Sequence, residues 1–177
     1  MPLMVHEVFI SHSSDDNAAA REMCLVLESA GIQCWIAPRD IVPGRSWSGA
    51  IVDGIEGSRV VVVVISARAN ASHEVLREVE LASRRGKAVV GVRIEDFTPS
   101  GDLGYFLLST QWLNVFPPPF RPHLHTLVEV VARQLGVEEP MPEAKQPPAP
   151  EFVEVNLDDF GRRRPRKGIV QRLFEDR

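Results

Sequence analysis

A carboxylate without a visible partner is the first group in this 177-residue chain whose setting suggests chemistry. Glu78 lies in the stretch SHEVLREVELASRRG, residues 72–86. Within it Val75, Val79 and Ala82 recur at helical spacing, which predicts an amphipathic helix with an apolar stripe. Glu78 falls at the edge of that stripe.

The charged neighbours along this predicted helix do not neutralise Glu78. Glu80 has Arg84 four residues on, in the orientation that favours an ion pair. Glu78 instead has apolar residues three and four positions on and a like charge, Glu74, one turn back. Both features raise the pKa of a carboxyl group, a direction typical of functional carboxylates. The alternative is an ordinary helix-edge glutamate that tertiary partners satisfy.

The elements that must position this helix alternate along the chain. Apolar β-branched runs predict strands, and amphipathic segments between them predict helices. The order predicts a three-layer α/β fold with a parallel sheet and right-handed crossovers. The expected strands are residues 6–11, 32–37, 59–66, 87–94 and 111–115, and the expected helices are residues 15–31, 46–58, 72–86 and 123–136.

In such a sheet, ligands bind outside the carboxyl ends of the strands. The three loops that follow the first three predicted strands therefore form the expected functional edge. They are SHSSDD, PRDIVPGRSW and SARANASHE, which follow the first three predicted strands. Asp15 or Asp16 is expected to cap the helix after the first loop. Two glycines, Gly49 and Gly54, weaken the helical pattern after the second.

Composition narrows the class of protein. A net charge of −4 and a pI near 5.7 argue against a general nucleic-acid binder. The longest apolar run, residues 60–65, suits a buried strand and is too short to span a bilayer. The first residues lack the pattern of a secretory signal, and Cys24 and Cys34 lack metal spacing. We expect a cytoplasmic protein without membrane contact, in which both cysteines are reduced core residues rather than a disulfide.

The chain divides by composition into three parts. Residues 1–136 carry the alternating pattern and form the expected domain, whereas residues 137–150 are a proline-rich linker. Residues 151–177 contain the basic run RRRPRK and are too short and polar for a core of their own. This tail is expected to be a solvated, flexible segment, or to bind nucleic acid or an acidic partner.

Several common chemistries lack their motifs. No Walker loop or G-x-G-x-x-G turn follows the first strand, and no nucleophile elbow is present. A phosphoacceptor receiver domain needs an aspartate where Ser66 ends the third strand. His123 and His125 lie beside a proline turn and are better explained as solvated residues than as metal ligands. No cofactor is expected.

Four blocks together resemble a known family. EVFISHSSDD, GIQCWIAPRDIVPGRSW, SRVVVVVIS and SHEVLREVELA resemble, in order and spacing, a bacterial TIR domain over residues 5–136. The resemblance implies a flavodoxin-like five-stranded sheet in the order 2-1-3-4-5. It also implies that the second loop is the BB loop through which TIR domains assemble. Its interaction residues would be Asp40, Ile41, Val42, Pro43, Gly44 and Arg45.

The resemblance also implies a reaction. Many TIR domains cleave NAD at the nicotinamide–ribose bond with one glutamate in the pattern S-x-W-C-x-x-E-L-x-x-A. Ser72 and Glu78 match its serine and glutamate, whereas Glu74 and Val75 replace its tryptophan and cysteine. A carboxylate near the anomeric carbon stabilises an oxocarbenium-like transition state. Because nicotinamide leaves as a neutral molecule, no strong general acid is needed.

Four other residues are candidate substrate contacts. Ser11 and His12 follow the first strand and are placed to contact ribose or phosphates, or to form the turn before the next helix. Arg39 is a candidate for the pyrophosphate, or for a pair with Asp40 or a partner domain. Trp47 is a candidate for stacking on a nucleotide base, or for packing at a helix start.

Two functions remain open from sequence. The first is an NAD glycohydrolase that releases nicotinamide and ADP-ribose or a cyclic isomer, activated by assembly with other TIR domains, in bacterial antiphage defence or as an effector. The second is a non-catalytic module that signals through TIR–TIR contacts. Glu78 and Trp47 favour the enzyme, and the absence of tryptophan at position 74 favours the module. A sensor or activator protein that acts through the tail is a further expected partner.

Overall fold

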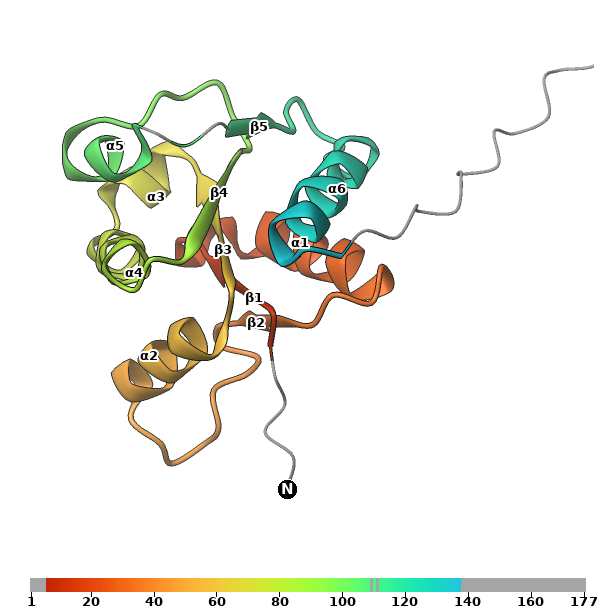
Figure 1. The fold of residues 1–177 in the computed structure, drawn as a ribbon. Helices are drawn as coiled ribbons and strands as arrows, with labels where there is room; N and C mark the ends of the chain where they lie inside the picture. The colour runs from red at the N-terminus through yellow and green to blue at the C-terminus, as the bar shows by residue number, and fades with distance from the viewer. Residues whose placement is uncertain (1–5, 109, 111, 138–177) are drawn as a thin grey trace, which may run out of the picture. The chain divides into compact units, whose positions relative to one another are not determined.

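A five-stranded parallel sheet lies at the centre of the computed structural model, which describes residues 6–108, 110 and 112–137. The strand order is β2-β1-β3-β4-β5 (Figure 1), so the predicted flavodoxin-like fold and strand order 2-1-3-4-5 are confirmed. The strands are β1 (Val8–Ser11), β2 (Cys34–Ile36), β3 (Val60–Ile65), β4 (Ala88–Arg93) and β5 (Trp112–Asn114).

Helices cover both faces of the sheet and complete the three layers (Figure 1). On one face lie α1 (Asn17–Ser29) and α6 (Leu124–Leu135). On the other face lie α2 (Trp47–Gly57), α4 (His73–Arg84) and α5 (Gly101–Leu107), together with the short α3 (Ala67–Ala71) that follows β3. Short 3-10 turns, Ser14–Asp16 and Arg121–His123, precede α1 and α6.

Strand β3 divides the core between the two faces. All six of its side chains are fully buried. Its even-numbered valines pack with α1 and α6, and its odd-numbered residues pack with α2, α4 and α5. Successive side chains of a strand point to opposite faces, so an unbroken apolar run is what a central strand between two helical layers requires.

Close packing explains a glycine that weakens the helical pattern of α2. A Cβ atom on Gly54 would lie 2.8 Å from the ring of Trp35. That ring stacks on Phe9 with 4.9 Å between ring centroids. The glycine therefore lets α2 approach the sheet, and the helix forms despite the lower propensity. Cys24 and Cys34 are buried free thiols, as predicted.

Two helices were not expected from the sequence. Helix α3 is a short helix capped by Ser66, whose Oγ accepts a hydrogen bond from the amide of Ala69. Helix α5 contains Gly101 and Gly104, which disguise its helical pattern. Asp16 does occupy the N-cap position of α1, but its carboxylate makes no capping hydrogen bond.

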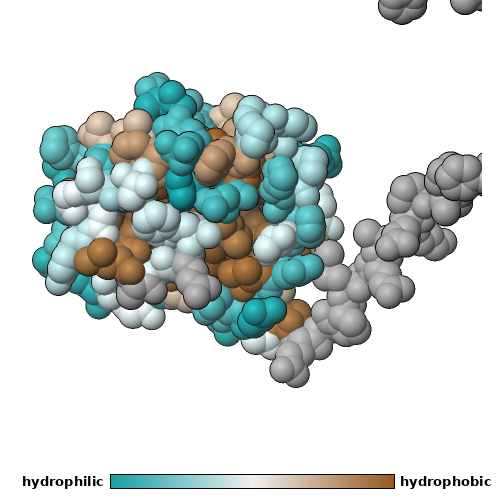
Figure 2. All heavy atoms as spheres, turned by 90° about the horizontal axis from the view of Figure 1, so that it is seen from above, coloured by the Kyte–Doolittle hydropathy of each residue, from teal (hydrophilic) through white to brown (hydrophobic). Residues whose placement is uncertain are grey.

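The surface of the protein carries hydrophobic patches (Figure 2). Figure 2 shows such patches among hydrophilic side chains on the face viewed there. Tyr105 and Leu108, at α5, are exposed by 71% and 78%. Among the described residues, no helix has the length and hydropathy needed to cross a membrane. Apart from Val137, the predicted linker and tail lie outside the described residues.

Candidate active site

The carboxylate that is unpaired along its own helix has a partner across the fold. Helix α4 begins after Ser72, whose Oγ accepts a hydrogen bond from the amide of Val75. The apolar stripe of α4 packs on the sheet, which brings Glu78 to the end of β1. There the hydroxyl of Ser11, the last residue of β1, donates a hydrogen bond of 2.6 Å to Oε2 of Glu78. Ser11 itself is fully buried.

The surroundings of Glu78 favour its protonated form. Burial raises its pKa from an ordinary 4.5 to about 7, and the like charge of Glu74 acts in the same direction. The hydrogen bond from Ser11 opposes both by stabilising the ionised carboxylate. The structure thus agrees with the pKa direction expected from sequence. The result is a carboxyl group that titrates near neutral pH, whereas Glu80 is fixed to Arg84 by an ion pair of 2.6 Å, as expected.

Glu78 lines a cavity of about 690 Å³ at the carboxyl edge of the sheet. The loops after β1, β2 and β3 and the helices α2 and α4 form its walls, as the gathering of three loops at this edge predicts. Among the candidate residues, the cavity brings together His12, Trp47 and Glu78, with Ser11 hydrogen-bonded to Glu78.

A second, smaller groove of about 330 Å³ lies between α2 and α4. It shares Trp47, Glu74 and Glu78 with the larger cavity, so Glu78 stands where the two meet. The indole of Trp47 is 56% exposed and is not a core residue. The rest of the groove is mainly apolar, with Arg77 as its cation. This arrangement offers room for a ligand that extends to both sides of one carboxylate.

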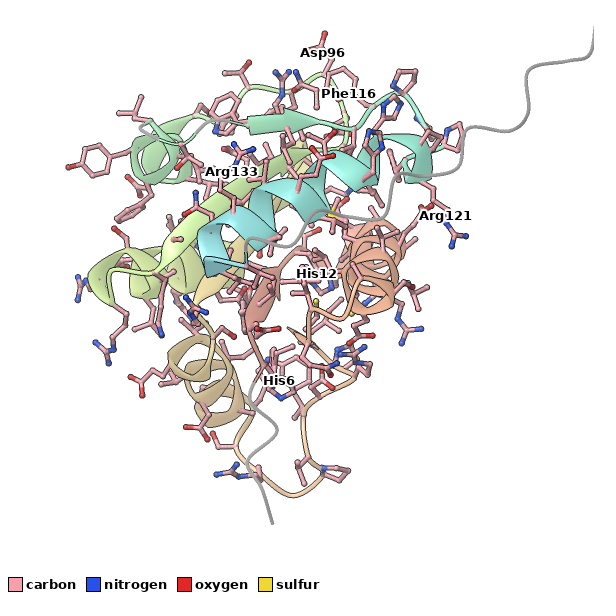
Figure 3. The ribbon with its side chains drawn as sticks, turned by 45° about the vertical axis from the view of Figure 1, so that its right-hand side comes forward. His6, His12, Asp96, Phe116, Arg121 and Arg133 are labelled. Atoms are coloured by element: carbon pink, nitrogen blue, oxygen red, sulfur yellow. The ribbon has the colours of Figure 1, made fainter. Side chains whose placement is uncertain are left out.

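His12 presents a neutral ring to the cavity. Burial lowers its pKa. Its Nδ1 lies 3.4 Å from the carbonyl oxygen of Ile10, and its Nε2 lies 3.4 Å from the side-chain nitrogen of Asn17. A ring protonated on Nδ1 donates to the first group and accepts from the second. Figure 3 shows His12 beside α1.

Arg39 is not among the residues that line either the cavity or the groove. Its guanidinium pairs with Glu28 at 2.9 Å and with Asp40 at 2.9 Å, and it donates to the carbonyl oxygen of Cys34 at 2.7 Å. Of the two partners that the sequence offered, the structure shows the pair with Asp40. These contacts tie the start of the loop to α1 and β2.

The loop that the resemblance identifies as the BB loop is exposed beyond its anchored start. Asp40 accepts a hydrogen bond of 2.8 Å from the amide of Ile36, and Ile41 is half-buried. Val42, Pro43, Gly44 and Arg45 are exposed. Gly44 has a φ of 85°, a left-handed conformation that favours glycine.

Sequence reasoning missed the cation that does line the cavity. Arg68, on α3, donates from Nε to Oδ1 of Asp16 at 2.9 Å. Asp16 is buried, and its Oδ2 accepts hydrogen bonds from Ser13 and Ser66. The signal was present in part, because Arg68 follows the third strand and Asp16 belongs to the acidic pair after the first. Their pairing depends on the sheet that joins them.

The described residues contain no group of three histidine, cysteine or acidic side chains arranged to hold a metal ion. The groups around the cavity at Glu78 include its carboxylate, the hydroxyl of Ser11 that is hydrogen-bonded to it and the exposed indole of Trp47. A carboxylate beside an aromatic wall suits stabilisation of positive charge on a bound ring.

Comparison with known proteins places the fold. The chain is 33% identical over 106 residues to a stimulator of interferon genes protein of Magallana gigas, a match that covers 54% of this chain and 26% of that protein. A metazoan TIR-STING receptor from C. gigas, solved with 2',3'-cGAMP, has 28% identity and a TM-score of 0.58, covering 74% of this chain and 40% of the receptor. This chain thus spans less than half the length of each of these two relatives.

A second similar structure is the TIR domain of the Toll-related receptor TRR-2 from Hydra magnipapillata. It has 21% identity and a TM-score of 0.58, and the likeness covers 71% of this chain and 98% of that domain. At this identity the likeness concerns the fold. The family described as TIR domain matches residues 8–128, well over half of the sequence, and the chain therefore belongs to the TIR domain family.

Proposed function

We propose that this TIR domain cleaves NAD at the nicotinamide–ribose bond and releases nicotinamide with ADP-ribose or a cyclic isomer. One observation carries the proposal: Glu78, a carboxyl group with a pKa raised to about 7, stands where a cavity of about 690 Å³ meets a smaller groove. A structural carboxylate in this position would be expected to have a cationic partner, and Glu78 has a serine hydroxyl instead.

The chemistry needs the ionised form of Glu78. As the bond to nicotinamide lengthens, positive charge moves from the pyridinium ring to the ribose, which becomes oxocarbenium-like. A carboxylate close to the anomeric carbon stabilises that charge, and the electron pair of the broken bond neutralises the departing nicotinamide. The hydroxyl of Ser11 holds Oε2 at 2.6 Å and so orients the carboxylate. Water then forms a bond to the anomeric carbon and loses a proton to solvent, which gives ADP-ribose, or a nitrogen of the adenine forms that bond and gives the cyclic isomer.

The aromatic group missing at position 74 has a candidate replacement. Trp47, the first residue of α2, lines the same cavity and groove as Glu74 and Glu78. An exposed indole beside two carboxylates suits a cationic aromatic ring, since the face of the indole is electron-rich. In this proposal Trp47 flanks the nicotinamide, and Glu74 adds a negative charge that attracts it.

The family supports a role in signalling that depends on assembly. One structure similar to this chain is a TIR-STING receptor, a protein in which a TIR domain is part of a receptor. We propose that TIR–TIR contacts activate the enzyme, and that it acts in bacterial antiphage defence or as an effector. A sensor acting through residues 151–177, outside the described residues, stays a prediction.

The alternative is an interaction module without catalysis. The exposed loop favours it, because Val42 is 57% exposed at a loop whose start is firmly anchored by Arg39 and Asp40. Val42 lies in the loop that the resemblance identifies as the BB loop, where an exposed apolar side chain is available for contact with another TIR domain. The two functions are compatible, since contact through the loop can serve either.

Nicotinamide release by three matched proteins tests the proposal. The wild-type chain, Glu78→Gln and Glu80→Gln are incubated with NAD at high protein concentration with a crowding agent. Glu78→Gln keeps the size of the side chain and removes its charge, whereas Glu80→Gln makes the same change two residues away on an exposed ion pair. We expect release by the wild type and by Glu80→Gln, with a loss of at least about a hundredfold in Glu78→Gln. Equal release by all three would refute the role of Glu78.

A further inference from the structure

We propose that Arg68, rather than Arg39, binds the diphosphate of the dinucleotide, and that the larger cavity therefore takes the ADP-ribosyl half. This inference rests on the proposed function, because it assigns a binding residue for its substrate. It starts from the different places of two arginines at the same edge of the sheet, Arg39 after β2 and Arg68 after β3.

Charge is the first reason. Apart from the neutral ring of His12, the titratable side chains that line the larger cavity are Asp15, Arg68, Glu74 and Glu78. Three of these are acidic and would repel a ligand that carries two negatively charged phosphates. Arg68 supplies the positive charge that such a ligand needs in order to bind in the cavity. Among the described residues that line this cavity, Arg68 is the one arginine or lysine. Arg39 lines neither the cavity nor the groove.

The orientation of the guanidinium is the second reason. Nε of Arg68 donates to Asp16, whose side chain is 1% exposed, and this contact fixes the arginine at its inner edge. Nη2 lies 3.8 Å from Glu95, which is a loose contact. The side chain of Arg68 as a whole is 50% exposed. A guanidinium held through Nε still offers its two terminal nitrogens, the geometry that pairs with phosphate oxygens.

The buried support behind Arg68 is the third reason. Asp16 accepts hydrogen bonds from Ser13, which follows β1, and from Ser66, which directly follows β3. This network anchors the arginine to the sheet, and an arginine positioned before the ligand arrives loses less entropy on binding. Arg39 is equally well held, but by Glu28 and Asp40 outside the cavity.

The volumes of the cavity and the groove lead to the same placement of the two halves of the dinucleotide. The larger cavity has about 690 Å³, and the groove between α2 and α4 has about 330 Å³. Glu78 lines both, so the bond to be broken lies at their junction. With the diphosphate on Arg68, the ADP-ribosyl half fills the larger space, and nicotinamide enters the groove beside Trp47.

Binding of the product ADP-ribose tests this assignment without any turnover. Isothermal titration or ligand-observed NMR is used with the full chain, and adenosine serves as the probe without phosphates. We expect Arg68→Gln to weaken ADP-ribose binding by about tenfold or more, and to change adenosine binding by less than about twofold. Arg68→Lys, which keeps the charge, should retain part of the affinity.

Two matched variants complete the design. Arg77→Gln removes the cation of the smaller groove, and Arg39→Gln removes the arginine of the loop. Both should bind ADP-ribose as the wild type does. The inference is overturned if either of these variants weakens ADP-ribose binding as much as Arg68→Gln does. It is also overturned if Arg68→Gln weakens adenosine binding as much as ADP-ribose binding, or if the wild type binds ADP-ribose no more tightly than adenosine. A wild type that binds ADP-ribose but leaves NAD intact would contradict the proposed function alone.

Discussion

The raised pKa of Glu78 predicts that removing its charge stabilises the protein at alkaline pH. In the folded state the pKa is raised from 4.5 to about 7, so the folded chain binds this proton more tightly than the unfolded chain. The resulting stabilisation is complete below about pH 4.5 and is lost as the pH rises through 7. Above that pH, folding has to place an ionised carboxylate in surroundings that favour the neutral form.

The magnitude follows from the shift. One pKa unit corresponds to about 1.36 kcal/mol, so the change from 4.5 to about 7 lowers the free energy of unfolding at alkaline pH by at most about 3.4 kcal/mol. The side chain of Glu78 is half-buried, and its remaining contact with solvent reduces this effect. We expect Glu78→Gln to be about 2 kcal/mol more stable than the wild type at pH 8 and nearly equal to it at pH 4.5.

Urea unfolding followed by tryptophan fluorescence at both pH values measures this difference. Glu80→Gln is the control, because its exposed ion pair should change stability by less than about 1 kcal/mol at pH 8. Equal stability of Glu78→Gln and the wild type at pH 8, or the same difference at both pH values, would refute the assignment of a raised pKa. A stabilising substitution that abolishes activity is characteristic of functional sites.

Three further predictions concern the neighbours of Glu78 and the core beneath it. Ser11→Ala removes the hydrogen bond that lowers the pKa of Glu78. The acid limb of the pH–rate profile for nicotinamide release should therefore move to higher pH. An unchanged limb would contradict the role of Ser11. Trp47→Ala should raise the KM for NAD by about tenfold. Because the indole is 56% exposed, the midpoint of thermal unfolding should stay nearly unchanged. A large loss of stability would instead indicate a packing role. Gly54→Ala should cost about 1–3 kcal/mol in urea unfolding, since its Cβ would lie 2.8 Å from Trp35, whereas Gly57→Ala, with open space around it, should have little effect.

The sequence was sufficient to predict the sheet, because its strongest signals come from local periodicity. The apolar run of β3 and the stripe of α4 each reflect burial along a single element. Helices α3 and α5 were missed for the same reason. Helix α3 is too short to show periodicity, and the glycines of α5 weaken its helical signal.

Individual site residues could be predicted from the sequence, but the contacts between residues far apart in the sequence could not. Glu78 was recognisable because its helix offered no partner, but its contact with Ser11 joins residues 67 positions apart and arises from packing of α4 on the sheet. The two arginines show the same limit. Arg39 and Arg68 both follow strands at the same edge, and which of them lines the cavity depends on where Glu28 and Asp16 hold them.

The most direct test of the central claim is one NMR time course of NAD with the wild-type chain at pH 8. At this pH most of Glu78 is ionised, and light scattering of the same sample establishes that the chain has assembled. We predict that free nicotinamide and an ADP-ribosyl product appear in equal amounts as NAD disappears. NAD that stays intact in a sample of demonstrated assemblies would contradict the claim and leave the interaction module as the function of this TIR domain.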